Sequence, residues 1–250
     1  MGGVRYYLSG CAHNHTFENK LGEWLAHDIT KTGSLVFIAG EVDNHYRTEV
    51  AGQWFTKELE SIGKSFEKVY AISKKTPAYL ARKWVKSADM IVMLGGNPIE
   101  QKAMCRKIKI WRMLRNYDGI MLGMSTGAMN ISEYVMVLPI SHEYPDFNIV
   151  PGLNRDGISI YPHKNTTEDE YPEMIALDYG ETYWRNDIIA ASDDAGPFLL
   201  LQDIHEESDG VDICHHSFVR ATDFNVEVVY EHNAKAWMAD GWKVELLERR

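Results

Sequence analysis

One pentapeptide places a hydroxyl nucleophile between glycines. Residues 123–127 read G-M-S-T-G, follow the apolar run Gly119–Leu122 and precede a small-residue helix start, A-M-N. A strand that turns sharply into a helix leaves one side chain standing at the carboxyl edge of a sheet, and flanking glycines allow that close packing. The pattern therefore predicts Ser125 as a nucleophile. The alternative is a tight strand-to-helix turn with an exposed serine.

A serine nucleophile needs a base and an oxyanion site. His163 comes just after the apolar stretch at Ile160 and Tyr161, and imidazole is the side chain best suited to exchange a proton near neutral pH. It is one of ten histidines, so a surface loop histidine is the competing interpretation. The N–H of Thr126, directly after the nucleophile, and that of Gly96 are candidate oxyanion donors. Gly95-Gly96 could also be a simple strand-ending turn.

The elements that must position these residues alternate along the first two thirds of the chain. Apolar stripes at helical spacing occupy 21–29 and 50–62, and a long helical pattern through Ile110, Trp111 and Leu114 follows the break at 95–98. Strands are expected at Val4–Leu8, Leu35–Ala39, Phe66–Ile72, Met90–Leu94 and Gly119–Leu122. This alternation predicts an α/β fold with a doubly wound, mostly parallel sheet and helices on both faces.

The last third is richer in strand patterns. Phe198–Leu201, Val226–Tyr230 and Trp242–Leu246 are expected strands. No linker or repeat interrupts the chain, so residues 1–250 are expected to form a single domain.

The composition limits the classes of partner that the protein is expected to bind. The chain has 26 basic and 36 acidic residues, a net charge of −10, which disfavours binding to nucleic acid or to an anionic membrane. No apolar run reaches the length of a membrane helix, and the N-terminus is too polar for a secretory signal. Three widely spaced cysteines argue against disulfides and zinc. We therefore expect a cytoplasmic protein.

Neither a cofactor nor a metal is expected. No dinucleotide-binding glycine pattern follows a predicted strand, and Gly63-Lys64-Ser65 lacks the first glycine of a phosphate-binding loop, since Glu58 stands there. The histidine pairs at 13 and 15 and at 215 and 216 lack further ligands at suitable spacing.

The ordered set of motifs resembles the peptidase E family of serine peptidases, which includes aspartyl dipeptidases and is related to cyanophycinases. M-L-G-G-N-P, G-M-S-T-G-A-M-N and Y-P-H follow one another with the family's order and rough spacing, from Leu35 through Phe198. The resemblance implies a flavodoxin-like sheet related to class I glutamine amidotransferases. It also implies a Ser–His–acid triad with Ser125 as nucleophile and His163 as base.

The family's acid commonly lies in a short acidic turn after the strand that follows the histidine. The resemblance matches Asp194 to that position, with Asp193 as the alternative. Its role would be to orient the imidazole. Glu133, Glu143 and Asp146 lie between nucleophile and base and stay open as candidates.

Thr126 departs from the family pattern, because alanine usually follows the nucleophile. The expected function is hydrolysis of short peptides, N-terminal aspartyl dipeptides among them, with a small peptide as the partner and the oligomeric state open, a homodimer included. Candidate cations for a substrate carboxylate are Arg82, Lys83, Arg155 and Lys164. The alternatives are a non-catalytic binding or interaction protein of the same fold and a glutaminase, which normally uses cysteine at the elbow.

Overall fold

The protein is built on a parallel sheet that antiparallel strands extend. The computed structural model describes residues 3–10, 17, 20–137, 148–154, 157–163, 174–176, 182–184, 195–208, 211–230, 234–240 and 243–247. Five parallel strands lie in the order β1-β5-β4-β2-β3. Their bounds are β1 Arg5–Leu8, β2 Ser34–Gly40, β3 Lys68–Ile72, β4 Met90–Gly96 and β5 Ile120–Met124. Three antiparallel strands continue the sheet beside β1: β12 Asp203–Ser208, β13 Val211–Ala221 and β14 Val226–Tyr230.

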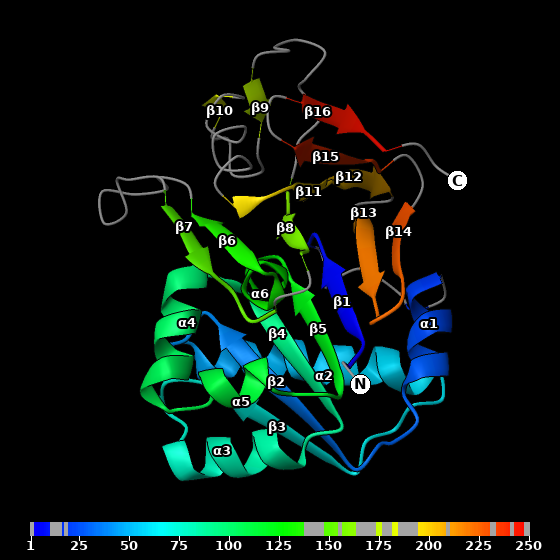
Figure 1. Ribbon diagram of the computed structural model, residues 1–250. Helices are drawn as coiled ribbons and strands as arrows, with labels where there is room; N and C mark the ends of the chain where they lie inside the picture. Colours follow the sequence, from blue (N-terminus) through cyan, green and yellow to red (C-terminus); the bar gives the residue numbers. More distant parts are fainter. Residues whose placement is uncertain are drawn as a thin grey trace.

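Helices cover both faces of this sheet (Figure 1). Their bounds are α1 Lys20–Asp28, α2 His45–Ser61, α3 Ala78–Ser87, α4 Pro98–Lys107, α5 Trp111–Arg115 and α6 Thr126–Ile131. Along β2, Val36 and Ile38 pack in one core with α3 to α6, whereas Leu35 and Phe37 pack in another with α1 and α2. Both faces of the strand are buried, which is why the central strands read as unbroken apolar runs.

A second sheet stands over the carboxyl ends of the parallel strands. Its order is β16-β15-β11-β8, and Figure 1 shows β8 above the ends of β1 and β5. The bounds are β8 Ser159–Tyr161, β11 Phe198–Leu201, β15 Ala236–Asp240 and β16 Lys243–Leu246. Two small pairs complete the strands: β6 Tyr134–Val137 with β7 Asn148–Pro151, and β9 Met174–Ala176 with β10 Thr182–Trp184.

The predicted fold class is confirmed, with one correction in a helix. The long helical pattern predicted after the break at 95–98 is divided into α4 and α5. Lys109 adopts a left-handed backbone with φ of 64° between them, which an α-helix cannot accommodate. Among the described residues, no helix has both the length and the apolarity needed to cross a membrane.

Candidate active site

The G-x-S-x-G segment forms the sharp turn that its glycines predict. Ser125 joins β5 to α6 with φ of 51° and ψ of −117°, a strained conformation for a residue with a side chain. A Cβ on Gly123 would lie 2.5 Å from the Ala128 nitrogen, and one on Gly127 only 2.0 Å from the Met93 oxygen. Both glycines are therefore required for α6 to pack this closely against β5 and β4.

His163 lies directly against the serine. Its Nε2 is 2.6 Å from Oγ of Ser125, and its side chain is only 12% exposed. The histidine follows β8 in the second sheet, whereas Ser125 follows β5 in the first. Its backbone is left-handed as well, with φ of 59°. Among the described residues other than glycine, only Lys109, Ser125 and His163 have positive φ, so two of the three lie in this site.

Asp203 completes the chain of polar groups. Its Oδ2 is hydrogen-bonded to Nδ1 of His163, and its side chain is 2% exposed. A carboxylate at Nδ1 favours the tautomer with the proton on that nitrogen, which leaves Nε2 to accept the Ser125 hydroxyl proton. In this geometry the three side chains could act as a nucleophile, a general base and an orienting acid.

The acid expected from sequence was a different residue. Asp194 and its alternative Asp193 lie outside the described residues, as do Glu143 and Asp146. Among the described residues, the acid at Nδ1 of His163 is Asp203. Glu133 is directed elsewhere, because its carboxylate accepts the N–H of Gly157 at 2.6 Å.

The position of Asp203 follows from the pairing of two strands, which the sequence patterns do not reveal. β11 runs parallel to β8, with Leu200 beside Tyr161. Parallel neighbours end at the same edge, so the residues just after β11 must lie beside those just after β8. Phe198–Leu201 is predicted as a strand from its apolar pattern, but the resemblance to peptidase E assigns the acid to the segment before it. His163 and Asp203 each come two residues after the end of one of these strands.

The Gly95-Gly96 turn flanks the serine. A Cβ on Gly95 would lie 3.3 Å from Cβ of Ser125 and 3.7 Å from its Oγ. Gly96 has φ of 155°, and a Cβ there would be 2.3 Å from the carbonyl carbon of Gly40. The hydroxyl of Thr126 donates to the Gly96 carbonyl and so links the elbow to the turn. Both segments expected to supply oxyanion donors therefore lie beside the nucleophile.

A buried amide pair supports this turn from behind. Nε2 of Gln101 donates to the carbonyls of Ala39, at 3.2 Å, and Leu94, at 3.0 Å, near the ends of β2 and β4. Nδ2 of Asn130 on α6 donates to Oε1 of Gln101 at 2.8 Å and to the Pro98 carbonyl at 3.1 Å. The elbow helix and the glycine turn are thereby held in a fixed relation.

Asp203 is fixed by its neighbour in the chain. Gln202 lies where the chain passes from β11 in the second sheet to β12 in the first, and it is buried. Its backbone N–H donates to Oγ of Ser217 at 2.9 Å, and its Oε1 accepts the N–H of Lys235 at 2.8 Å. These bonds hold the start of β12, and with it the carboxylate. Neither Gln202 nor Asp203 belongs to a motif that the sequence patterns single out.

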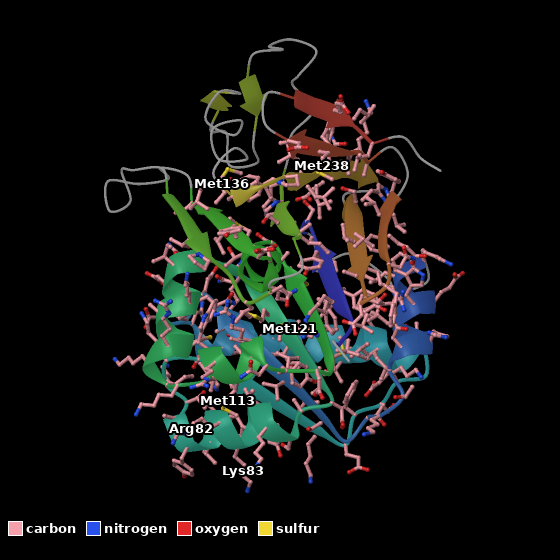
Figure 2. All side chains as sticks on the ribbon, in the orientation of Figure 1. Arg82, Lys83, Met113, Met121, Met136 and Met238 are labelled. Atoms are coloured by element: carbon pink, nitrogen blue, oxygen red, sulfur yellow. The ribbon has the colours of Figure 1, made fainter. Side chains whose placement is uncertain are left out.

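Of the four candidate cations, the structure describes only Arg82 and Lys83. Figure 2 labels Arg82 and Lys83 on α3, at the end of the molecule away from the second sheet. Arg155 and Lys164 are outside the described residues. Within the described ranges, no three His, Cys, Asp or Glu side chains come together as a metal-binding group.

Cys105 is not an alternative nucleophile. It is fully buried in α4, and burial raises the pKa of its thiol to about 12. The thiolate is the reactive form of cysteine, so this thiol is inert near neutral pH.

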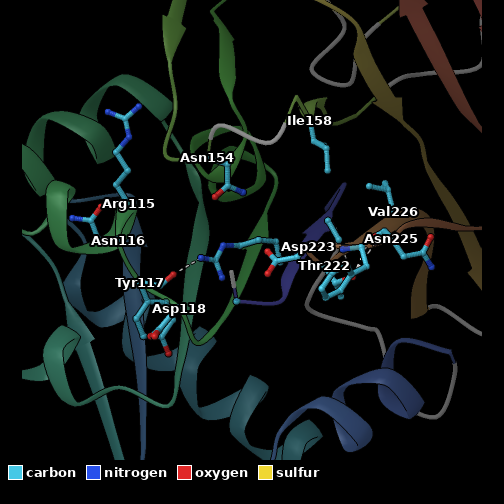
Figure 3. Close-up of a pocket in the computed structure, with 14 residues that line it drawn as sticks. Arg115, Asn116, Tyr117, Asp118, Asn154, Ile158, Thr222, Asp223, Asn225 and Val226 are labelled. Carbon is cyan, nitrogen blue, oxygen red and sulfur yellow. Dashed lines mark hydrogen bonds between the residues drawn. The ribbon is translucent and has the colours of Figure 1, made fainter. Parts of the chain in front are cut away.

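A cavity of about 720 Å³ lies at the opposite edge of the sheet (Figure 3). It is lined by residues that precede β1 and β5 and by the turn between β13 and β14. Figure 3 shows Arg115 and Asn116 on one side and Asp223 and Asn225 on the other. None of Ser125, His163 and Asp203 lines it.

Two solved structures resemble the chain along most of its length. A peptidase from an acI-B1 actinobacterium superposes with a TM-score of 0.54 at 13% identity, over 99% of this chain and 94% of that one. A Listeria monocytogenes EGD-e protein that carries the name peptidase E superposes with a TM-score of 0.57 at 13% identity, over 93% of this chain and 100% of that one. The chain has a peptidase E-like fold. At 13% identity this resemblance concerns the fold alone. No protein-family model matches the sequence, and no curated protein matches it either.

Proposed function

We propose that the protein is a serine peptidase that hydrolyses short peptides through an acyl-enzyme. The observation that carries the proposal is the contact of 2.6 Å between Oγ of Ser125 and Nε2 of His163, with Asp203 at the other ring nitrogen. The strained elbow and the peptidase E-like fold add support.

The chemistry assigns one task to each side chain. Ser125 attacks the peptide carbonyl carbon while His163 takes the hydroxyl proton, and Asp203 stabilises the imidazolium that forms. The N–H groups of Gly96 and Thr126 are proposed to bind the oxyanion of the tetrahedral intermediate. His163 then gives the proton to the leaving amine. A water molecule, activated by the same imidazole, releases the acyl group from Ser125.

The substrate class follows from the resemblance to peptidase E. Short peptides with an N-terminal aspartate are the first substrates to test, beside matched peptides that begin with alanine or lysine. A preference for aspartate would indicate a cation near the nucleophile.

A fluorophosphonate probe tests the proposal directly. We expect the wild-type protein to be labelled at one serine and Ser125→Ala to remain unlabelled. The labelling rate should rise with pH as the His163 imidazolium loses its proton, because only the neutral ring accepts the serine proton. Peptide mapping of the labelled protein identifies the serine, and circular dichroism shows whether the fold persists across the pH range.

The rival function is binding without catalysis. A folded wild-type protein that resists the probe, cleaves no short peptide and still binds peptides would support the rival and contradict our proposal.

A further inference from the structure

The last residue of β1 and the two residues after it together contact every member of the Ser125–His163–Asp203 group. The carbonyl of Leu8 accepts the N–H of Ser125 at 2.9 Å, and Oγ of Ser9 accepts the N–H of His163 at 2.9 Å. Gly10 lies against the side chains of His163 and Asp203. A Cβ on Gly10 would be 2.6 Å from Cε1 of His163 and 2.8 Å from Oδ2 of Asp203. One short turn thus touches three residues that are far apart in the sequence.

Ser9 holds the base by its backbone. His163 has φ of 59°, which is unfavourable for a residue with a side chain and is kept only where neighbours enforce it. Ser9 is fully buried, and its hydroxyl donates to the Leu201 carbonyl at 3.1 Å while it accepts the His163 N–H. The serine therefore connects the end of β1 to the residues that follow β8 and to the end of β11.

We propose that Ser9 is a positioning residue for the general base. Its hydroxyl fixes the backbone of His163 so that the imidazole spans the gap between Ser125 and Asp203. The inference rests on the function proposed above. It goes beyond the triad because Ser9 touches neither the nucleophile's hydroxyl nor any reacting atom.

The chain contains a matched control for a lost buried hydroxyl. Ser132 is also fully buried, and its Oγ donates to the Ala128 carbonyl at 2.9 Å while it accepts the N–H of Ile160 at 3.0 Å. Ser9→Ala and Ser132→Ala therefore remove the same two kinds of hydrogen bond, one donated to a backbone carbonyl and one accepted from a backbone N–H. They differ in that Ser132 bonds to β8 itself, whereas Ser9 bonds to the base.

The experiment compares the two variants by fluorophosphonate labelling, by kcat and KM on a short peptide, and by melting temperature. Ser9→Ala should slow labelling and lower kcat roughly 10²-fold with little change in KM, because a small misplacement of a catalytic group costs about that much. Ser132→Ala should stay within about threefold of wild type, a factor worth under 1 kcal/mol. Both variants should lose similar stability.

A second measurement separates this inference from the proposed function. A downfield proton resonance, assigned to Nδ1–H of His163 by its loss in His163→Gln, reports the bond to Asp203 without any turnover. We expect Ser9→Ala to weaken or abolish it and Ser132→Ala to keep it. If the wild-type protein shows this resonance and loses it in Ser9→Ala but hydrolyses nothing, the positioning role stands and the peptidase proposal fails.

Two outcomes of the comparison would contradict the positioning role of Ser9. Equal slowing in Ser9→Ala and Ser132→Ala, or wild-type labelling and an intact resonance in Ser9→Ala, would refute the positioning role and leave the peptidase proposal standing. If Ser9→Ala does not fold, Ser9→Cys provides the test. It keeps nearly the same side-chain size with a weaker hydrogen-bonding group, and it should slow labelling roughly tenfold. Wild-type labelling in Ser9→Cys would contradict the inference.

Discussion

The two edges of the central sheet use polar residues in opposite ways. At the carboxyl edge, Ser125 and His163 have left-handed backbones, and their side chains bond to one another. At the amino edge, the guanidinium of Arg5 donates to the backbone carbonyls of Val4, Tyr117 and Gly119. The amino edge has the cavity of about 720 Å³ (Figure 3), yet Arg5 is used there to satisfy the backbone. We therefore place the proposed chemistry where strained backbone and converging polar side chains coincide, and not at this cavity.

The largest effect expected from this contrast is at the nucleophile. Ser125→Ala should lower peptide turnover by roughly 10⁴–10⁶-fold, because the loss of a nucleophile disables the triad as a unit. The melting temperature should stay the same or rise, since alanine tolerates the turn at least as well and the elbow is strained. Turnover, melting temperature and peptide affinity measured on one preparation check this. Turnover near the wild-type rate would mean that Ser125 is only architectural.

The second-largest effect on turnover is expected at the acid that bonds to His163. Asp203→Asn should reduce turnover by roughly 10³–10⁴-fold, because an amide at Nδ1 favours the wrong imidazole tautomer. Glu133→Gln is the matched control, since Glu133 binds the Gly157 backbone instead of the histidine. It should keep turnover close to wild type. Steady-state kinetics on Asp203→Asn, Glu133→Gln and Asp194→Ala measure these effects. If Asp203→Asn kept near wild-type turnover while Asp194→Ala lost it, the assignment of Asp203 would be wrong.

A smaller effect is expected at the oxyanion turn. Thr126→Val keeps the size and branching of the side chain but removes the hydroxyl that donates to Gly96. We expect kcat to fall roughly tenfold, about 1.4 kcal/mol of transition-state stabilisation, with KM nearly unchanged. Thr126→Ser keeps the hydroxyl and should retain most of the rate. Equal kcat in the valine and serine variants would show that the link to Gly96 does not contribute.

The smallest effect on turnover is expected at the amino edge. Arg5→Met should leave turnover within about twofold of wild type while lowering the free energy of unfolding by about 2–3 kcal/mol, because carbonyls near a buried position lose a charged donor. Chemical denaturation and peptide hydrolysis on the same sample measure both quantities. A large loss of turnover with normal stability would break the contrast between the two edges.

Much of the architecture was predictable from local patterns. Met90–Leu94 and Gly119–Leu122 read as strands because both of their faces are buried, and the structure has β4 and β5 there. The division between α4 and α5 was not predicted, because lysine rarely adopts a left-handed backbone and Lys109 therefore does not indicate one. The second sheet was foreseen only as strands, since nothing in the sequence states which of them pair.

The residues of the candidate site also differ in whether the sequence predicts them. Ser125 could be found because its strand, turn and helix are contiguous, and His163 because it follows a strand in a motif that resembles peptidase E. Asp203 and Ser9 were not found, because no short pattern marks either residue. Their roles depend on where β1, β8 and β11 end relative to one another.

By itself, the sequence determined the alternation of strands and helices, the buried central strands and the sharp elbow, because periodicity and glycine sterics act over a few residues. Only the tertiary structure decided which acid and which serine meet the histidine. Ser125 and His163 are 38 residues apart, His163 and Asp203 are 40 apart, and Ser9 and His163 are 154 apart. Contacts at such separations are set by strand pairing between two sheets, which buries apolar side chains such as Leu200 and brings the polar residues beyond the strand ends together.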